Sequence, residues 1–170
     1  MSGPRVRFEW PPPRCMVVAE LSANHGGSLE VALEAVRAAA RAGADAIKIQ
    51  TYRPDTLTID APQEHFVVRG GPWDGRTLYD LYQEAHTPWE WHAPIFEAAH
   101  EAGIPAFSTP FDASAVDFLE SLEVPAYKIA SFELVDLELL RRVASTKKPI
   151  VMSTGMATLE EIARSVAAIR

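Results

Sequence analysis

Short apolar runs alternate along this chain with longer segments whose apolar residues recur at helical spacing. The runs lie at about 16–21, 46–51, 105–111, 125–131 and 149–154. Each is six or seven residues long and mostly apolar, which is typical of parallel strands buried on both faces. The segments that follow, one of them after a long polar stretch, predict helices at about 29–45, 88–102, 113–122, 136–145 and 158–169. The pattern therefore predicts five consecutive strand-then-helix units.

The turns between these units help to decide the fold class. "AGAD", "AGIP", "LEVP" and "TKKP" end the helices with Gly or Pro just before each strand. An open doubly wound sheet usually carries a glycine-rich phosphate loop after its first strand, and "ELSANHGG" does not have that spacing. We therefore predict an α/β fold, a partial (β/α)₈ TIM barrel of about five units with parallel strands, where a whole barrel needs eight units and about 250 residues.

The predicted organisation has a lead-in and one domain. Residues 1–15 form a Pro-rich lead-in, and residues 16–170 form the amino-terminal part of the barrel domain, with an irregular insertion at about 52–88. A short helix is expected in the insertion at "TLYDLYQEA". Loops of this length are often functional lids, and an ordinary surface excursion is the alternative.

Composition narrows the function classes. The chain has 170 residues, 48% hydrophobic content and a net charge of -7, which argues against nucleic acid or an anionic membrane as partner. The single cysteine excludes an internal disulfide framework and favours a reducing compartment. No apolar run approaches the roughly 18 residues of a membrane span, and the start has no signal-peptide core. We expect a cytoplasmic protein.

Polar residues gather at the predicted carboxyl ends of all five strands, where TIM barrels carry their active sites. The residues in question are Glu20, Ser22, Asn24, His25, Lys48, Gln50, Ser108, Thr109, Lys128, Ser131, Glu133, Ser153 and Thr154. The opposite strand ends carry no comparable set. This asymmetry is the strongest functional signal in the pattern itself.

Two lysines stand inside apolar strands, Lys48 in "AIKIQ" and Lys128 in "AYKIA". Because neighbours in a strand face opposite ways, each lysine is expected to point into the barrel. Two inward ammonium groups repel each other unless an anion lies between them, and each contact with an anion contributes about 4 kcal/mol before desolvation. Nearby hydroxyls can donate to phosphate or carboxylate oxygens. The alternative is that hydroxyls cap helices, which we expect of Thr158 in "ATLEE".

The acidic and histidine side chains leave alternatives open. Glu20 and Glu133 could form salt bridges with the lysines, or serve as a general acid or base or as anchors for substrate hydroxyls. His25 lies in the first strand-end loop and is a catalytic candidate. The other four histidines are expected in packing or surface roles, and no pair has metal-ligand spacing. We therefore predict no metal site within this chain.

Six ordered motifs carry a resemblance over nearly the whole chain from about Val17. They are "AELSANHGG", "GADAIKIQTY", "TLYDLYQEAHTPWEW", "FSTPFD", "YKIASFE" and "MSTGMAT". The chain resembles the sialic acid synthase family and is most similar to its pseudaminic acid synthase branch. The resemblance implies a barrel enzyme that condenses phosphoenolpyruvate with an N-acetylated aminosugar in its open aldehyde form. The products would be a nine-carbon 2-keto sugar acid and phosphate.

The resemblance also assigns residues. The positions that match phosphoenolpyruvate ligands are Lys48, Thr109, Lys128, Ser131 and Ser153, and Asn24 and Gln50 join them as substrate-binding candidates from their place at the rim. Glu20 matches an acid near the reacting carbons and Glu133 one near the sugar and metal. A divalent metal, Mn²⁺ or Mg²⁺, is implied for the full-length enzyme. Its two histidine ligands, three more strands and an antifreeze-like domain are expected beyond Arg170, and the full-length enzyme is expected to be a homodimer.

Two other functions fit the same residues. Lys48 or Lys128 could be the amine nucleophile of a Schiff-base aldolase. The chain could also be a non-catalytic partial barrel that binds an anion or a partner chain. The identity of the aminosugar is not determined by the sequence.

Overall fold

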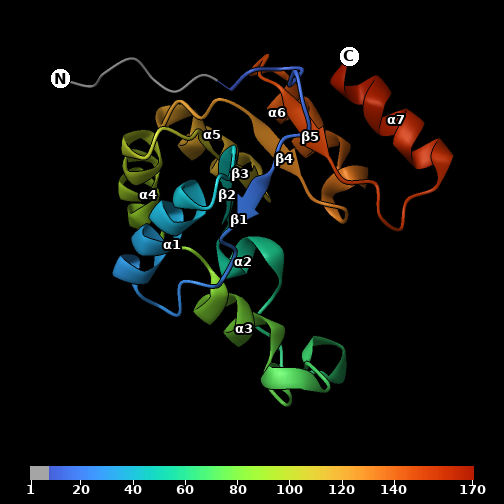
Figure 1. Cartoon of the computed structure of the whole chain (residues 1–170). Coiled ribbons are helices and arrows are strands. Elements are labelled where there is room, and N and C mark those ends of the chain that lie inside the picture. Colours follow the sequence, from blue (N-terminus) through green and yellow to red (C-terminus); the bar gives the residue numbers. More distant parts are fainter. Residues whose placement is uncertain (1–7) are drawn as a thin grey trace.

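The computed structural model describes residues 8–170, so residues 1–7 of the predicted lead-in lie outside the described part. Five parallel strands form one sheet in the order β1-β2-β3-β4-β5 (Figure 1). They are β1 Val18–Glu20, β2 Ala46–Thr51, β3 Ala106–Pro110, β4 Tyr127–Ile129 and β5 Ile150–Met152. Neighbours in sequence are neighbours in the sheet, which is the order of a TIM barrel rather than of a doubly wound sheet.

All five predicted helices form close to their expected positions. They are α1 Leu29–Arg41, α4 Trp89–Glu101, α5 Ala113–Ser121, α6 Leu137–Ala144 and α7 Leu159–Ile169. Thr158 begins α7 with a capping box, accepting from the Glu161 amide while the Glu161 carboxylate accepts from Thr158. The helix-capping alternative is therefore confirmed for this hydroxyl.

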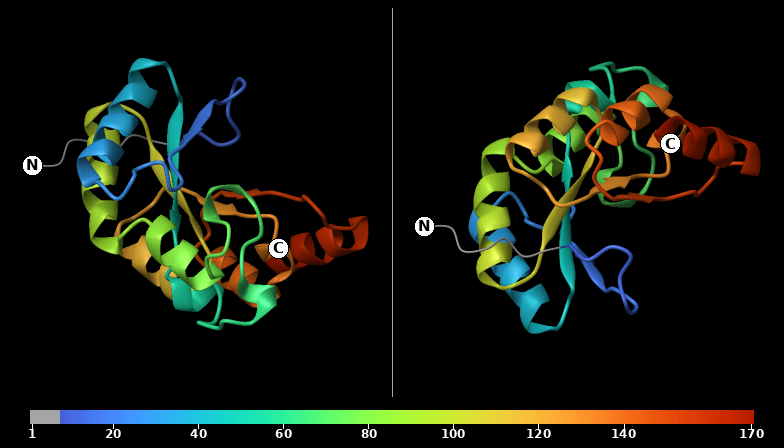
Figure 2. Two further views of the ribbon diagram at one scale, coloured as in Figure 1. Left: turned by 90° about the horizontal axis from the view of Figure 1, so that it is seen from below. Right: turned by 90° about the horizontal axis from the view of Figure 1, so that it is seen from above.

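The helix-facing side of the sheet carries most of the apolar core. Ile47 and Ile49 pack against α1 and α4, and Tyr127 and Ile129 pack against α5 and α6. All four are at most 2% exposed, and burial of such side chains contributes about 1.5–3 kcal/mol each. The helices follow the convex side of the strands (Figure 2), and the sheet is a curled half-barrel. The predicted fold class is confirmed.

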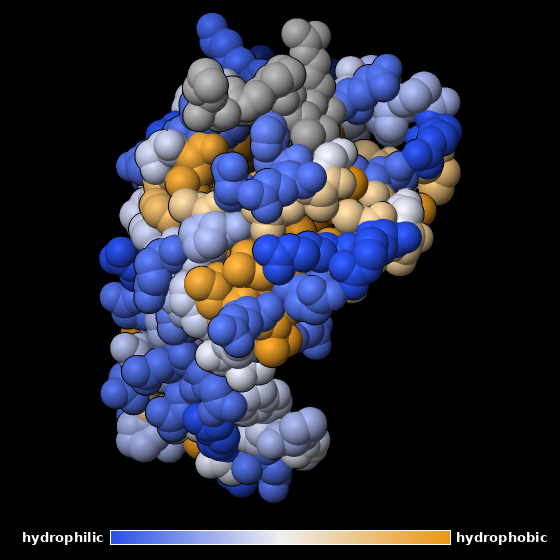
Figure 3. Space-filling view, turned by 60° about the vertical axis from the view of Figure 1, so that its left-hand side comes forward, coloured by the Kyte–Doolittle hydropathy of each residue, from blue (hydrophilic) through white to orange (hydrophobic). Residues whose placement is uncertain are grey.

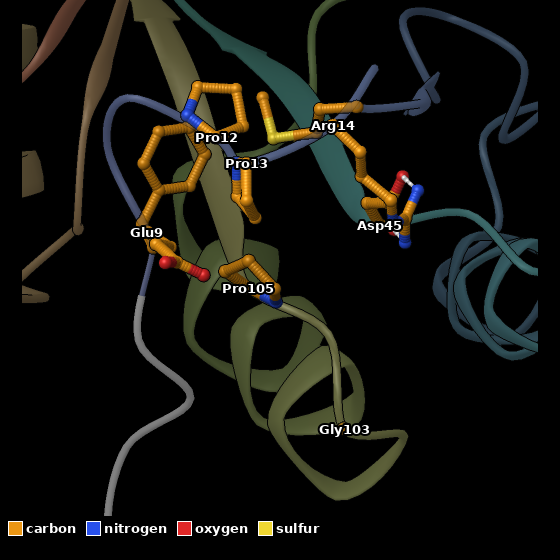
Figure 4. A pocket seen from close by; sticks show the side chains of 9 residues that line it. Glu9, Pro12, Pro13, Arg14, Asp45, Gly103 and Pro105 are labelled. Atoms are coloured by element: carbon orange, nitrogen blue, oxygen red, sulfur yellow. Dashed lines mark hydrogen bonds and ion pairs between the residues drawn. The ribbon is translucent and has the colours of Figure 1, made fainter.

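The lead-in covers the amino ends of the strands. The ring of Phe8 packs edge-on against Phe107, with a centroid distance of 5.4 Å, and both belong to an inner cluster with Ala46 and Ala126. Arg14 forms an ion pair with Asp45, just before β2. A cavity of about 250 Å³ lies between the lead-in and Gly103 to Pro105 (Figure 4). This cavity is at the opposite end of the strands from the polar rim.

The insertion after β2 projects beyond the carboxyl ends of the strands (Figure 1). Its helices are α2 Pro54–Leu57 and the expected α3 Leu78–Ala85, and 3₁₀ turns η1 Glu64–Phe66 and η2 Gly71–Trp73 lie between them. Tyr52 anchors the insertion to the sheet, because its ring packs edge-on against Tyr82 of α3 and against Phe111, just after β3. The lower part of Figure 3, which this segment forms, is mainly hydrophilic.

Three details differ from the sequence pattern. The strands β1, β4 and β5 are three residues long, although residues next to them, such as Leu21 and Ser153, still donate a backbone hydrogen bond to the neighbouring strand. The short helices α2, η1 and η2 lie where no element was predicted. A third 3₁₀ turn, η3 Glu133–Val135, follows β4. No helix within residues 8–170 has the length and apolar character needed to cross a lipid bilayer.

Candidate functional site

Lys48 and Glu20 lie side by side on the inner face of the sheet. They are direct partners in the register between β1 and β2, so their side chains emerge next to each other on the same face. The Lys48 ammonium and the Glu20 carboxylate form an ion pair, with side chains 16% and 36% exposed. The salt bridge that the sequence left as an alternative is therefore present for this pair.

Burial controls the charge of Lys48. Removal from water lowers the pKa of Lys48 to about 8, and the positive charge of Lys128 acts in the same direction. Contact with Glu20 favours the charged form of the lysine. The ammonium is thus held in a place where its charge is poorly solvated, which makes it a strong partner for an incoming anion.

Lys128 points toward the end of the neighbouring strand and not outward into solvent. Its ammonium donates to the Ser153 hydroxyl at 2.7 Å and to the carbonyl of Ile129. The pKa of Lys128 is lowered mainly by burial, and the charge of Glu133 opposes this shift. No ion pair joins Lys128 to Glu133, so the internal Lys to Glu pair considered for "YKIASFE" does not form.

The loops after β4 and β5 are held together at this point. The Ser153 amide donates to the Ile129 carbonyl at 3.0 Å, which extends the strand pairing by one bond. A Cβ on Gly155 would lie 2.9 Å from the Ser131 hydroxyl oxygen, so the two loops are in close contact. Ser153 therefore contacts Lys128 directly, and Ser131 lies against Gly155, two residues beyond Ser153.

Gln50 and Thr109 extend the same inner face. They are register partners on β2 and β3, and each lies two residues beyond an inward side chain, Lys48 or Phe107. The side-chain oxygen of Gln50 lies 3.5 Å from the Ser22 hydroxyl, which joins the β1 loop to β2. Thr109 on β3 thus lies between the two strands that carry the lysines, and Gln50 lies beside it on β2.

Glu133 begins the turn η3, close to Lys128. One of its carboxylate oxygens is buried and has no hydrogen-bond partner. Burial raises the pKa of Glu133, and the charge of Lys128 acts against that shift. A buried oxygen without a partner is costly in the free protein, and it is free to bind a donor such as a sugar hydroxyl.

Asn24 and His25 lie in the loop after β1. The Asn24 amide nitrogen donates to the Leu21 carbonyl at 3.0 Å. His25 is 1% exposed, accepts from the Gly27 amide through Nδ1 and packs edge-on against Trp91 of α4. Burial lowers its pKa, partly opposed by the Ala85 carbonyl. The ring contact holds His25 against α4, its buried Nε2 has no hydrogen-bond partner within the described residues, and none of these contacts involves the two lysines.

Ser108 faces away from the rim, contrary to its place in the predicted constellation. Its hydroxyl lies 2.6 Å from that of Thr51 and donates to the Ile49 carbonyl at 3.1 Å. The hydroxyl oxygen of Thr51 in turn lies within hydrogen-bonding distance, 2.8 Å, of Nε2 of His92. All three side chains are fully buried on the helix side of the sheet. The sequence pattern placed Ser108 and Thr109 at the rim together. Alternation puts Thr51 and Ser108 on the helix side of the sheet and Gln50 and Thr109 on the inner side, and only the exact strand register shows which residue lies on which side.

The residues described do not form a metal site of their own. Within residues 8–170 there is no group of three or more His, Cys, Asp or Glu side chains that could hold a metal ion. Glu133 offers one unpartnered carboxylate oxygen, which is a single donor. A divalent ion needs several ligands, so Glu133 alone could not hold one.

The arrangement suits a small anion with several oxygens. Two half-buried ammonium groups face the same inner surface, and hydroxyl and amide donors lie next to them on the neighbouring strands and loops. Charge-assisted hydrogen bonds of this kind are about twice as strong as neutral ones. Such a surface can hold a phosphate or carboxylate group and withdraw charge from it.

Comparison with known proteins identifies the group to which this geometry belongs. The NeuB family model matches residues 35–170. A pseudaminic acid synthase of Campylobacter jejuni is 54% identical over 149 residues, covering 88% of this chain and 43% of that protein. A pseudaminic acid synthase of Helicobacter pylori is 46% identical, covering 94% of this chain and 46% of that protein. The chain thus spans less than half the length of these relatives.

Solved structures agree with the sequence relatives. An N-acetylneuraminic acid synthetase from Leptospira borgpetersenii, solved with citrate, superposes with a TM-score of 0.78 at 27% identity. The match covers 91% of this chain and 49% of that one. A spore coat polysaccharide biosynthesis protein from Bacillus subtilis gives a TM-score of 0.72 at 32% identity, over 91% of this chain and 40% of that one. Because the family model covers well over half of the chain and the half-barrel agrees with these structures, the chain belongs to the NeuB family.

Proposed function

We propose that this chain carries the phosphoenolpyruvate-binding part of a sugar acid synthase. The observation that carries the proposal is the pair of inward lysines, Lys48 and Lys128, half-buried beside hydroxyl donors at the carboxyl ends of parallel strands. The reaction would join phosphoenolpyruvate to an N-acetylated aminosugar. The product would be a nine-carbon 2-keto sugar acid of the pseudaminic or sialic type, with release of phosphate.

Each residue has a role that its position supports. Lys128, Ser131 and Ser153 would bind one anionic group of phosphoenolpyruvate at the ends of β4 and β5. Lys48, Gln50 and Thr109 would bind along β2 and β3, where they share the inner face. Asn24 would approach from the β1 loop. Together they would fix the ligand so that its CH₂ carbon faces the sugar, which removes much of the entropic cost of a two-substrate reaction.

The chemistry would proceed in three steps. The CH₂ carbon of phosphoenolpyruvate forms a bond to the aldehyde carbon of the open sugar, and the aldehyde oxygen takes up a proton to become a hydroxyl. The adjacent carbon, which bears the phosphate oxygen, becomes an oxocarbenium-like centre and gains a hydroxyl from water as that water loses a proton. The bond between this carbon and the phosphate oxygen then breaks, and phosphate leaves as the new hydroxyl loses its proton to form the 2-keto group. The lysines would stabilise the negative charge of phosphate and carboxylate throughout.

The two acids would act on either side of this reaction. Glu20 forms an ion pair with Lys48 and would lie near the reacting carbons. Glu133, whose pKa is raised by burial, would hold or accept a proton near the sugar hydroxyls. His25, a catalytic candidate from its place in the loop after β1, would act as a positioning residue through that loop, because it packs against Trp91 of α4. In the full-length enzyme a divalent metal would supply Lewis-acid activation of the aldehyde.

A cytoplasmic location and a homodimeric full-length enzyme belong to the same proposal. The homodimer follows from the resemblance to sugar acid synthases, and the location from the single cysteine, which favours a reducing compartment. Sedimentation of the full-length protein would check the dimer, and fractionation of cells would check the location.

Two measurements test the proposal together. Calorimetry of this chain with phosphoenolpyruvate should show saturable binding that inorganic sulfate, which has no carboxylate group, matches only weakly. Phosphate release should then be measured from the full-length protein with phosphoenolpyruvate, Mn²⁺ and N-acetylated aminosugars. Binding with no release from the full-length protein with any sugar would support the non-catalytic alternative, and no binding would contradict the proposed site.

One observation favours a second candidate, the Schiff-base aldolase. With its pKa lowered to about 8, Lys48 has an appreciable neutral fraction near neutral pH and could act as a nucleophilic amine. Borohydride should trap a pyruvate adduct on Lys48 if this chemistry operates, and Lys48→Arg should abolish the adduct. Phosphate release with no trapped adduct would reject it.

A further inference from the structure

Gly155 stands apart from the other described glycines. Seven of them, from Gly26 to Gly103, have positive φ angles and open space where a Cβ would be. Gly155 does not have a positive φ, and a Cβ there would lie 2.9 Å from the hydroxyl oxygen of Ser131 and 3.5 Å from its Cβ. The need for glycine at 155 is therefore steric and concerns one neighbouring side chain, whereas the other glycines serve backbone conformation.

The surroundings of this contact are fixed on both sides. The Ser153 amide is bonded to the Ile129 carbonyl, and Lys128 reaches across to the Ser153 hydroxyl. These bonds prevent the loops after β4 and β5 from separating easily. An added methyl group at 155 would therefore be relieved by the most mobile atom in reach, the Ser131 hydroxyl, which can turn to another staggered position about its Cα–Cβ bond.

We propose that Gly155 is a positioning residue that sets the direction of the Ser131 hydroxyl. The open space at Gly155 allows this hydroxyl to stand beside Lys128 and donate to the same anion. This inference rests on the proposed binding of phosphoenolpyruvate at Lys128, Ser131 and Ser153. The substrate contact itself belongs to Ser131, and Gly155 acts through it.

The test is a double-mutant cycle with phosphoenolpyruvate, measured by calorimetry on this chain. Ser131→Ala removes one hydrogen bond to an anion, and we expect about tenfold weaker binding. Gly155→Ala should weaken binding by a similar factor because it turns the same hydroxyl away. In the Ser131→Ala background, Gly155→Ala should cause little further loss, since the oxygen that it would strike is gone.

A second measurement is independent of ligand. Three-bond couplings of the Ser131 side chain, measured by NMR in the free protein, should report a different staggered position in Gly155→Ala than in the unaltered chain. An unchanged rotamer would overturn the positioning role. An unchanged far-ultraviolet spectrum and thermal midpoint would show that the variant is folded.

The outcomes separate the two proposals. If the unaltered chain does not bind phosphoenolpyruvate, the proposed function of this chain is overturned. Gly155 then positions no phosphoenolpyruvate ligand, and its effect on the Ser131 rotamer is tested by NMR alone. If it binds, and Gly155→Ala weakens binding by equal factors with and without the Ser131 hydroxyl, only the role of Gly155 is overturned. Loss in the single variant with no further loss in the double variant supports both.

Discussion

Lys48 on β2 and Lys128 on β4 both face the inner side of the sheet, but they have different partners. Lys48 is paired with a carboxylate, Glu20, whereas Lys128 donates only to neutral oxygens of Ser153 and Ile129. Neutral partners compensate an ammonium charge less completely than a carboxylate does. Lys128 is therefore the cation with more to gain from an external anion, and the two lysines should contribute unequally to binding.

Replacement of Lys128 by methionine tests that difference. Lys128→Met should weaken phosphoenolpyruvate binding by about ten- to a hundredfold, because one partly buried charge-assisted contact is lost. Its thermal stability should change little, since a buried ammonium is removed along with its neutral hydrogen bonds. Lys147→Met removes the same charge from an exposed position and is the control. Equal binding by the two variants would contradict the assignment.

Proton uptake on binding tests the state of Lys48. Its pKa in the free protein is about 8, and a bound anion favours the charged form and raises that pKa. Binding between about pH 8 and 9 should therefore take up a fraction of a proton, and affinity should fall as pH rises through this range. Calorimetry in buffers with different ionisation enthalpies measures the uptake. Lys48→Arg stays charged and should show much less uptake, so equal uptake in that variant would exclude Lys48 as its source.

At the scale of elements, β2, β3 and α4 are joined by polar groups rather than by apolar packing alone. Thr51, Ser108 and His92 form a continuous buried chain of hydrogen bonds from β2 and β3 to α4. Burial lowers the pKa of His92 to about 4, so the ring is neutral near neutral pH. This network lies directly behind Gln50 and Thr109, and so it supports the strands that carry the proposed site.

Removal of one hydroxyl from this network should cost stability and leave binding intact. Ser108→Ala leaves Thr51 and the Ile49 carbonyl each short of one buried partner, and we expect about 1–3 kcal/mol of destabilisation. Chemical denaturation measures the change. Ser121→Ala removes an exposed hydroxyl that also donates to a carbonyl and should cost less than about 0.5 kcal/mol. Similar losses in the two variants would show that burial of the network has little effect.

At the scale of the whole molecule, the half-barrel is covered by apolar packing at one end and carries the polar rim at the other. Phe8 and its cluster cover the amino ends of the strands, and the rim with the lysines lies at the carboxyl ends. The insertion with α2 and α3 projects beyond that rim (Figure 1). The amino ends of the strands, which lie away from the polar rim, are therefore the ends where the lead-in adds apolar packing.

The lead-in should accordingly stabilise the domain. Phe8→Ala removes a ring that contacts Phe107 and the inner cluster, and we expect about 1–3 kcal/mol of destabilisation, less than for a fully buried phenylalanine. Thermal unfolding followed by circular dichroism measures it. Ile59→Ala removes a large apolar side chain that is 63% exposed and serves as the control. A midpoint for Phe8→Ala equal to that of the control would show that the lead-in packs without adding stability.

The sequence by itself determined the elements and much of the site. Helical and strand periods record which residues are buried, so the five units, their order and the inward direction of Lys48 and Lys128 could be predicted from alternation. The motif resemblance led to the family that the comparisons confirm. These features depend on neighbours along the chain, which the sequence displays directly.

Only the tertiary structure determined which side chains contact one another across the strands and loops. The Glu20 to Lys48 pair depends on the register of β1 and β2, and the position of Ser108 behind the sheet depends on which of two adjacent polar residues faces inward. The burial of His25 against Trp91 and the contact of Gly155 with Ser131 join residues from separate loops. A one-residue shift of register would move each side chain of a strand to the other face of the sheet. The local sequence carries no signal strong enough to fix that register.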